Sequence, residues 1–194
     1  MSVSVSVGVR ADSTTITVAL ALSTLPLYPS SMKTLLRTLL SFALIVWIGA
    51  EIFFPIIAAI TFNTLRPDTH AAGTIVGQLL RILHGMGLVA GVVALAVLAL
   101  APAWGIYKPR AVLAPMALLV VMIAATVYSQ FGIIPVMDRD LRAAGNAIEG
   151  TDITNPTTIH FNTLHQRSVF VEESVLLLGL ATVVMVAWAE STRT

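Results

Sequence analysis

The stretch LLSFALIVWIGAEIFFPIIAAITF, from Leu39 to Phe62, decides the fold class of this chain. It runs for 24 residues with one ionisable side chain, that of Glu51, whereas about 20 apolar residues are enough for a helix to cross a bilayer. Comparable apolar stretches lie at residues 82–101, 111–134 and 169–189. The sequence therefore predicts an all-α integral membrane protein, a four-helix bundle with up-and-down topology.

The composition supports this class and argues against several functions. The 194 residues are 57% hydrophobic and 11% charged, with a mean hydropathy of +0.89, whereas soluble domains are about one quarter charged. A net charge of +1 supplies no basic field for nucleic acid, and a chain without cysteine has no thiol nucleophile or thiolate metal site. Walker, HExxH and GxSxG motifs are also missing. We therefore expect neither an enzyme nor a bound cofactor.

The first 31 residues differ from the rest of the chain. They are rich in Ser and Thr, and their apolar run, residues 16–22, is too short to cross a bilayer. Met32, followed by Lys33 and Arg37, resembles the usual start of a membrane protein. We predict that residues 1–31 are a disordered tail or lie upstream of the true start, in preference to a cleaved signal peptide. Residues 32–194 then form the four-span domain.

Two of the expected helices extend beyond their apolar stretches. The second is expected to begin near residues 70–73, well before its apolar part. After the third span, residues 137–156 read as a long polar joint that ends in Asn155-Pro156. Asn is a favoured N-cap and Pro a favoured first helical residue, so the fourth helix is expected to run from Pro156 to about Ala189. Its length would be on the order of 50 Å, which leaves its first turns outside the hydrocarbon.

The distribution of cations gives a weak orientation signal. Lys33, Arg37, Lys108 and Arg110 lie close to the spans on one side, and a similar number of arginines lies on the other. Their concentration near the first span and in the short PAWGIYKPR turn favours both termini in the cytoplasm. The expected location is the cell (inner) membrane.

Ionisable and amide side chains converge on one membrane face if consecutive spans alternate in direction. The residues predicted to form this candidate cluster are Glu51, Arg81, His84, Gln130, His165, Ser168 and Glu172. On the fourth helix, His165, Ser168 and Glu172 fall on one stripe at helical spacing. If this stripe faces the second helix, Arg81 or His84 lies beside Glu172 or His165. Such pairing is favourable because an unpaired charge in hydrocarbon has a high energetic cost.

Simpler explanations exist for each member of the cluster. A carboxylate as deep as that of Glu51 is usually functional, but a structural pair with Arg81 or a protonated acid would also account for it. Glu172 and Glu173 are close enough to the interface to reach water, which is the simpler interpretation of both. His84 and His165 fit interfacial hydrogen-bonding residues better than metal or haem ligands.

Two GxxxG patterns mark the second helix as a packing element. They are formed by Gly73 and Gly77 and by Gly87 and Gly91. Small residues at this spacing let a neighbouring backbone approach closely, although glycine is common in membrane helices in any case. The expected partners are therefore the lipid bilayer and either a second copy of the chain or another membrane protein.

Four segments in order give a resemblance to a known family. They are IVWIGAEIFFPIIAAITF, HAAGTIVGQLL, IIPVMDRDLR and FNTLHQRS. Together they resemble the transmembrane-protein-205-like family (domain of unknown function 4149) from about Leu35 to Ala187. The family pattern corresponds here to Trp47, Gly49, Pro135, Met137, Phe161, Leu164, His165 and Ser168. The resemblance implies four membrane spans and implies no reaction.

Three hypotheses for function follow from these features. The first is a non-enzymatic membrane protein whose polar cluster handles a small solute, a proton or a metal ion in transport or resistance. The second is a structural or assembly partner in which the polar residues only join helices. The third, which has the least support, is a haem-binding redox protein that uses the two histidines of the cluster.

Overall fold

A computed structural model describes residues 28–145 and 154–191 of the chain. Within them are four helices long and apolar enough to cross a membrane, at Ser30–Thr64, Thr69–Leu100, Leu113–Ala143 and Pro156–Ser191. The predicted class, an all-α integral membrane four-helix bundle, is confirmed. By its contacts the chain divides into one unit that ends at Leu35 and a second that begins at Leu36. The second unit contains the bundle.

Helix α2 (Tyr28–Thr64) begins earlier than the sequence suggested. Residues 28–31, assigned above to the tail, are helical, and the Thr34 hydroxyl donates to the Ser30 carbonyl at 3.1 Å. Pro29 is compatible with this start, because the first residues of a helix need no N–H donor. The remainder of the predicted tail, residues 1–27, lies outside the described residues.

Helix α3 (Thr69–Leu100) returns along α2 after a short turn. Asp68 is its N-cap, and Asp68 Oδ1 accepts a hydrogen bond from the Ala71 N–H at 2.9 Å. This cap explains why the helix starts 13 residues before Ile82, the first residue of the predicted span.

The third span is built from three consecutive elements. Helix α4 (Leu113–Tyr128) continues through a π-helical turn, η2 (Ser129–Ile133), into α5 (Ile134–Ala143). The predicted joint from residue 137 is therefore wrong in its first part, which is helical. Gly145, with φ of +74°, follows the end of α5 and supplies the left-handed residue that commonly terminates a helix.

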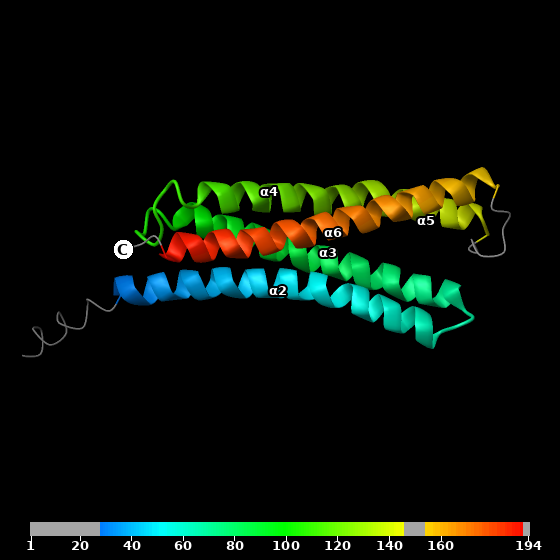
Figure 1. Ribbon diagram of the computed structural model, residues 1–194, viewed down its shortest axis with the longest axis horizontal. Helices are drawn as coiled ribbons and strands as arrows, with labels where there is room; N and C mark the ends of the chain where they lie inside the picture. Colours follow the sequence, from blue (N-terminus) through cyan, green and yellow to red (C-terminus); the bar gives the residue numbers. More distant parts are fainter. Residues whose placement is uncertain (1–27, 146–153, 192–194) are drawn as a thin grey trace, which may run out of the picture. The chain divides into compact units, whose positions relative to one another are not determined.

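Helix α6 (Pro156–Ser191) confirms the predicted start at Asn155-Pro156. Asn155 Oδ1 accepts from the Thr157 N–H at 2.9 Å, as an N-cap does. Figure 1 shows α6 alongside α4, with α5 beside its first turns, and these helices are in contact. Near the end of α6, Glu190 Oε1 accepts from the Tyr107 hydroxyl at 3.0 Å in the turn after α3. Burial and the Glu190 carboxylate raise the pKa of Tyr107, which therefore stays a neutral donor.

Candidate functional site

A regular stripe on α2 turns Glu51 toward the interior of the bundle. Leu40, Ala43, Leu44, Trp47, Ile48 and Glu51 are buried at spacings of three and four residues. Phe42 and Ile45, which lie between these residues, and Ile52, which follows them, are exposed and available to lipid. Glu51 is the last residue of this stripe and is 5% exposed, so its carboxyl group faces protein and not the acyl chains.

Trp47 is the immediate partner of Glu51, one turn earlier on the same helix. Its indole Nε1 donates to Glu51 Oε1 at 3.1 Å. The ring lies against Gly87 and Gly91 of α3, where a Cβ atom at either glycine would overlap it. The absence of side chains at these two positions therefore makes room for the indole that holds the carboxyl group.

His84 of α3 is the centre of the polar cluster and is fully buried. Its Nε2 lies 2.8 Å from Glu172 Oε1 of α6, and its Nδ1 lies 2.9 Å from Gln130 Oε1 of η2. One imidazole ring thus joins three elements that are far apart in the sequence. Both ring nitrogens are engaged by protein atoms, which leaves neither free as a ligand for haem iron.

These contacts accommodate two protonation states of the ring. If both facing oxygens accept, both nitrogens donate, and His84 is an imidazolium paired with the Glu172 carboxylate. If the Gln130 amide turns over, its NH₂ group donates to Nδ1 and the ring is neutral with its proton on Nε2. Gln130 can therefore form a hydrogen bond with His84 whether the imidazole ring is charged or neutral.

The π-helical turn directs two polar side chains toward this ring. Ser129 and Gln130 are its first residues, and the Ser129 hydroxyl donates to Glu172 Oε1 at 3.0 Å. The wide turn is marked by a hydrogen bond from the Ile134 N–H to the Ser129 carbonyl, five residues earlier. Pro135, which has no N–H, follows directly and cannot continue the regular pattern of hydrogen bonds. Single π turns of this kind are frequent at functional sites.

The two carboxyl oxygens of Glu172 differ in their hydrogen bonding. Oε1 accepts from both His84 and Ser129, whereas Oε2 is buried and has no hydrogen-bond partner among the described residues. The carboxyl group of Glu51 interacts electrostatically with both Glu172 and His84. At least one buried acceptor of the cluster, Glu172 Oε2, is therefore free to take a proton or a ligand.

The other predicted members of the cluster lie elsewhere. Arg81 binds Asp138 of α5 through Nη2 and its own Gly77 carbonyl through Nη1, so it pairs with neither Glu51 nor Glu172. His165 is exposed, and its ring stacks on that of Phe161. Ser168 is buried, but its hydroxyl donates to the His165 carbonyl at 2.8 Å. The structure thus brings together Glu51, His84, Gln130 and Glu172 and leaves the other three outside.

The Arg81–Asp138 pair is expected to add little stability. The side chains are 35% and 39% exposed, and ion pairs at this exposure contribute about 0–1 kcal/mol. We expect Asp138→Asn to lower the free energy of unfolding in detergent by less than about 1 kcal/mol, with the difference shrinking at high salt. A loss of more than about 2 kcal/mol would contradict this assignment and place the pair among the groups that hold the bundle together.

The four glycines of the GxxxG patterns do not behave alike. Gly87 and Gly91 lie against the Trp47 ring as described. At Gly73 a Cβ atom would meet nothing within 4 Å, and at Gly77 it would meet the side chain of Arg81 at 3.6 Å. The first pattern therefore brings no neighbouring helix close within the described residues.

Sequence reasoning missed Trp47, Ser129 and Asp138. Trp47 lies four residues before Glu51, a spacing at which two helical side chains meet, so its hydrogen bond could have been anticipated. Ser129 could not have been assigned in this way, because a regular helix would direct it elsewhere and the π turn is not apparent from composition.

Comparison with known proteins gives the family of the chain and no activity. The sequence model of the family described as Domain of unknown function (DUF4149) matches residues 42–144. This range runs from Phe42 in α2 through the end of α5 and includes Glu51, His84 and Gln130, while Glu172 lies beyond it. No curated protein and no solved structure shows significant similarity to the chain. With more than half of its residues matched, the chain, whose described residues form four helices able to cross a membrane, belongs to the family described as Domain of unknown function (DUF4149).

Proposed function

We propose that this protein handles protons in the membrane, alone or together with a small solute, through Glu51, His84, Gln130 and Glu172. The single observation that carries the proposal is the state of Glu172. One of its oxygens is held by His84 and Ser129, and the other is buried without a partner in the described chain. Ionisable groups inside a membrane commonly mark proton relays and ion pathways.

The chemistry proposed is uptake and release of a proton. His84 and Glu172 share one hydrogen bond along which a proton can pass, and Gln130 can adapt to either state of the ring. Glu51 provides a second carboxyl group within electrostatic range of both. Among residues 28–145 and 154–191 no group of three or more His, Asp or Glu side chains is placed to hold a metal ion. The proposed cargo is therefore a proton or a small solute, and the proposed role is not catalytic.

Proton movement by reconstituted protein tests the proposal. Vesicles that contain the full chain and a trapped pH-sensitive dye are given a pH gradient and a potassium diffusion potential. We expect the wild-type protein to dissipate the gradient faster than empty vesicles, and Glu172→Gln to reduce this excess rate at least tenfold, because a neutral amide cannot carry the proton. Glu173→Gln is the matched control, since Glu173 is the exposed neighbour on the same helix.

Two outcomes would count against this function. One is wild-type protein that moves protons no faster than empty vesicles. The other is an equal effect of the Glu172 and Glu173 substitutions.

A structural role is the second candidate, favoured by the way the same contacts cross the bundle. His84, Gln130 and Glu172 link α3, η2 and α6, and Trp47 seats α2 on α3. If this role is the whole function, Glu172→Gln should lower the melting temperature and leave proton movement unchanged. A variant that is fully stable and inactive would instead support the proton-handling role.

We also propose a narrower family relationship and a location for this protein. The segment FNTLHQRS, which resembles the transmembrane-protein-205-like proteins, lies in α6 and outside the matched residues 42–144. We propose that the bundle resides in the cell (inner) membrane with both of its ends on the cytoplasmic side. Four spans place the two ends on one side, and Lys33, Arg37, Lys108 and Arg110 are close to the spans there.

A further inference from the structure

A hollow between α4 and the first half of α6 is separate from the polar cluster. It has a volume of about 520 Å³ and opens to the outside of the bundle. Its lining residues are Tyr128, Thr163, Gln166, Arg167, Phe170 and Val171. Glu172 lies five residues after Arg167, about 140° around the helix, and therefore faces a different neighbour.

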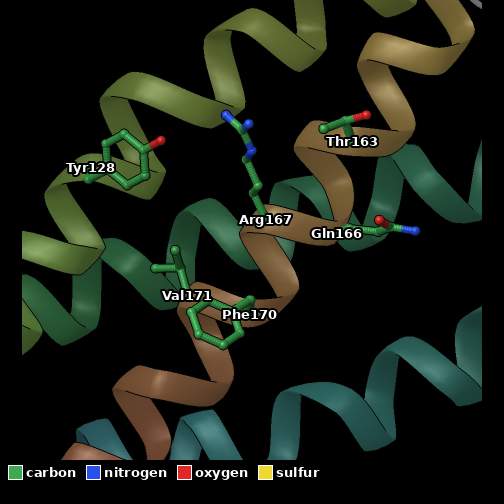
Figure 2. A pocket seen from close by; sticks show the side chains of 6 residues that line it. All are labelled: Tyr128, Thr163, Gln166, Arg167, Phe170 and Val171. Atoms are coloured by element: carbon green, nitrogen blue, oxygen red, sulfur yellow. The ribbon is translucent and has the colours of Figure 1, made fainter.

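The lining changes from polar to apolar along one face of α6. Thr163, Arg167 and Phe170 follow one another at spacings of four and three residues, so their side chains lie in a row. Figure 2 shows this row, with the Arg167 guanidinium extended toward the ribbon of α4 and its continuation, which carries Tyr128. Phe170 and Tyr128 are 70% and 52% exposed, which leaves an apolar wall uncovered by protein.

The hollow also lies beside the start of the fourth apolar stretch of the sequence. Arg167 lies two residues before Val169, where the fourth apolar stretch begins. Arg167 is exposed and forms no ion pair with any Asp or Glu of the described chain. An unpaired guanidinium above an exposed aromatic wall has the charge and the geometry for a phosphate that carries a hydrocarbon chain.

We propose that this hollow binds one anionic phospholipid. Its phosphate binds Arg167, the Gln166 amide offers a further donor to the headgroup, and one acyl chain lies along Phe170 and Tyr128. An anionic lipid fits better than a zwitterionic one because no carboxylate of the described chain neutralises Arg167. A lipid fits better than a soluble anion because three of the six lining residues, Tyr128, Phe170 and Val171, are aromatic or aliphatic, and two of these are largely exposed.

Lipid retention by the full chain tests this inference. The protein is purified in detergent, mixed with equal amounts of phosphatidylglycerol and phosphatidylcholine, and analysed by native mass spectrometry. We expect one phosphatidylglycerol per chain to be retained in preference to phosphatidylcholine. Arg167→Gln should reduce this retention about fivefold, the effect of one cation near an anionic headgroup. Arg66→Gln is the matched control, because Arg66 is an exposed arginine in the turn between α2 and α3 and does not line the hollow.

Two further arms identify the source of the phosphate. Phe170→Ala should weaken binding of long-chain phosphatidylglycerol and leave a short-chain analogue unaffected, and inorganic phosphate should not displace the lipid. Equal retention of the two lipids, equal losses in the Arg167 and Arg66 variants, or displacement by inorganic phosphate would each overturn the proposal. Failure here would leave the proton-handling proposal standing, because the two sites share no residue.

Discussion

Substitution of His84 by leucine is expected to lower the free energy of unfolding by about 3–5 kcal/mol, the usual cost of removing one partner from a buried charged pair. The ring is fully buried and bonds both Glu172 and Gln130. Its loss leaves a buried carboxylate with the Ser129 hydroxyl as its remaining hydrogen-bond donor among the described residues. The measurement is the apparent melting temperature in detergent, supported by unfolding in increasing concentrations of denaturant.

The double variant His84→Leu/Glu172→Leu separates pairing from packing. If the large loss comes from an unpaired carboxylate, removing both partners should recover much of it, because apolar side chains can replace a buried ionic pair at little cost. His165→Leu is the matched control, since His165 is an exposed histidine on α6. A His84→Leu protein as stable as the wild type would show that the network does not hold the helices together.

Alanine at Gly87 is expected to destabilise the bundle by about 1–3 kcal/mol, the usual range for forced overpacking. Its Cβ atom would overlap the Trp47 indole, which is confined between α2 and α3 and hydrogen-bonded to Glu51. The ring would have to move, and the Glu51 carboxyl group would lose its donor. Melting temperatures should therefore fall, and any activity that depends on Glu51 should fall with them.

Gly85→Ala provides a close control two residues away on the same helix. A Cβ atom there meets nothing within 4 Å, so alanine should be neutral or stabilise the helix by up to about 1 kcal/mol. A smaller ring at position 47, in the double variant Trp47→Phe/Gly87→Ala, should restore part of the loss. Equal melting temperatures for the Gly85 and Gly87 variants would refute the close approach of α3 to the indole.

Part of the polar cluster can be anticipated from the sequence. The depth of Glu51 in an apolar stretch and the alternation of helix direction were enough to place it at the same level as His84, Gln130 and Glu172. They were not enough to exclude Arg81 and His165. Asp138 lies in a segment that was expected to be a joint, but this segment is helical, and Asp138 forms the ion pair with Arg81. His165 shares a stripe with Glu172 by spacing but lies on an exposed part of α6.

The sequence by itself determined that the chain forms four membrane-crossing helices, because that outcome depends on local quantities. Apolar length sets the number of spans, and the lack of water in hydrocarbon requires each span to satisfy its own backbone as a helix. Capping residues such as Asp68 and Asn155 set helix starts in the same local way.

Only the tertiary structure decided which side chains meet. One residue of displacement rotates a side chain by about 100° around the helix axis, so the π turn at Ser129–Ile133 redirects the residues that it contains. The rotation of α2 is likewise set by the fit of Trp47 against Gly87 and Gly91, and that fit turns Glu51 inward. Both effects depend on packing between helices, which no single stretch of sequence specifies.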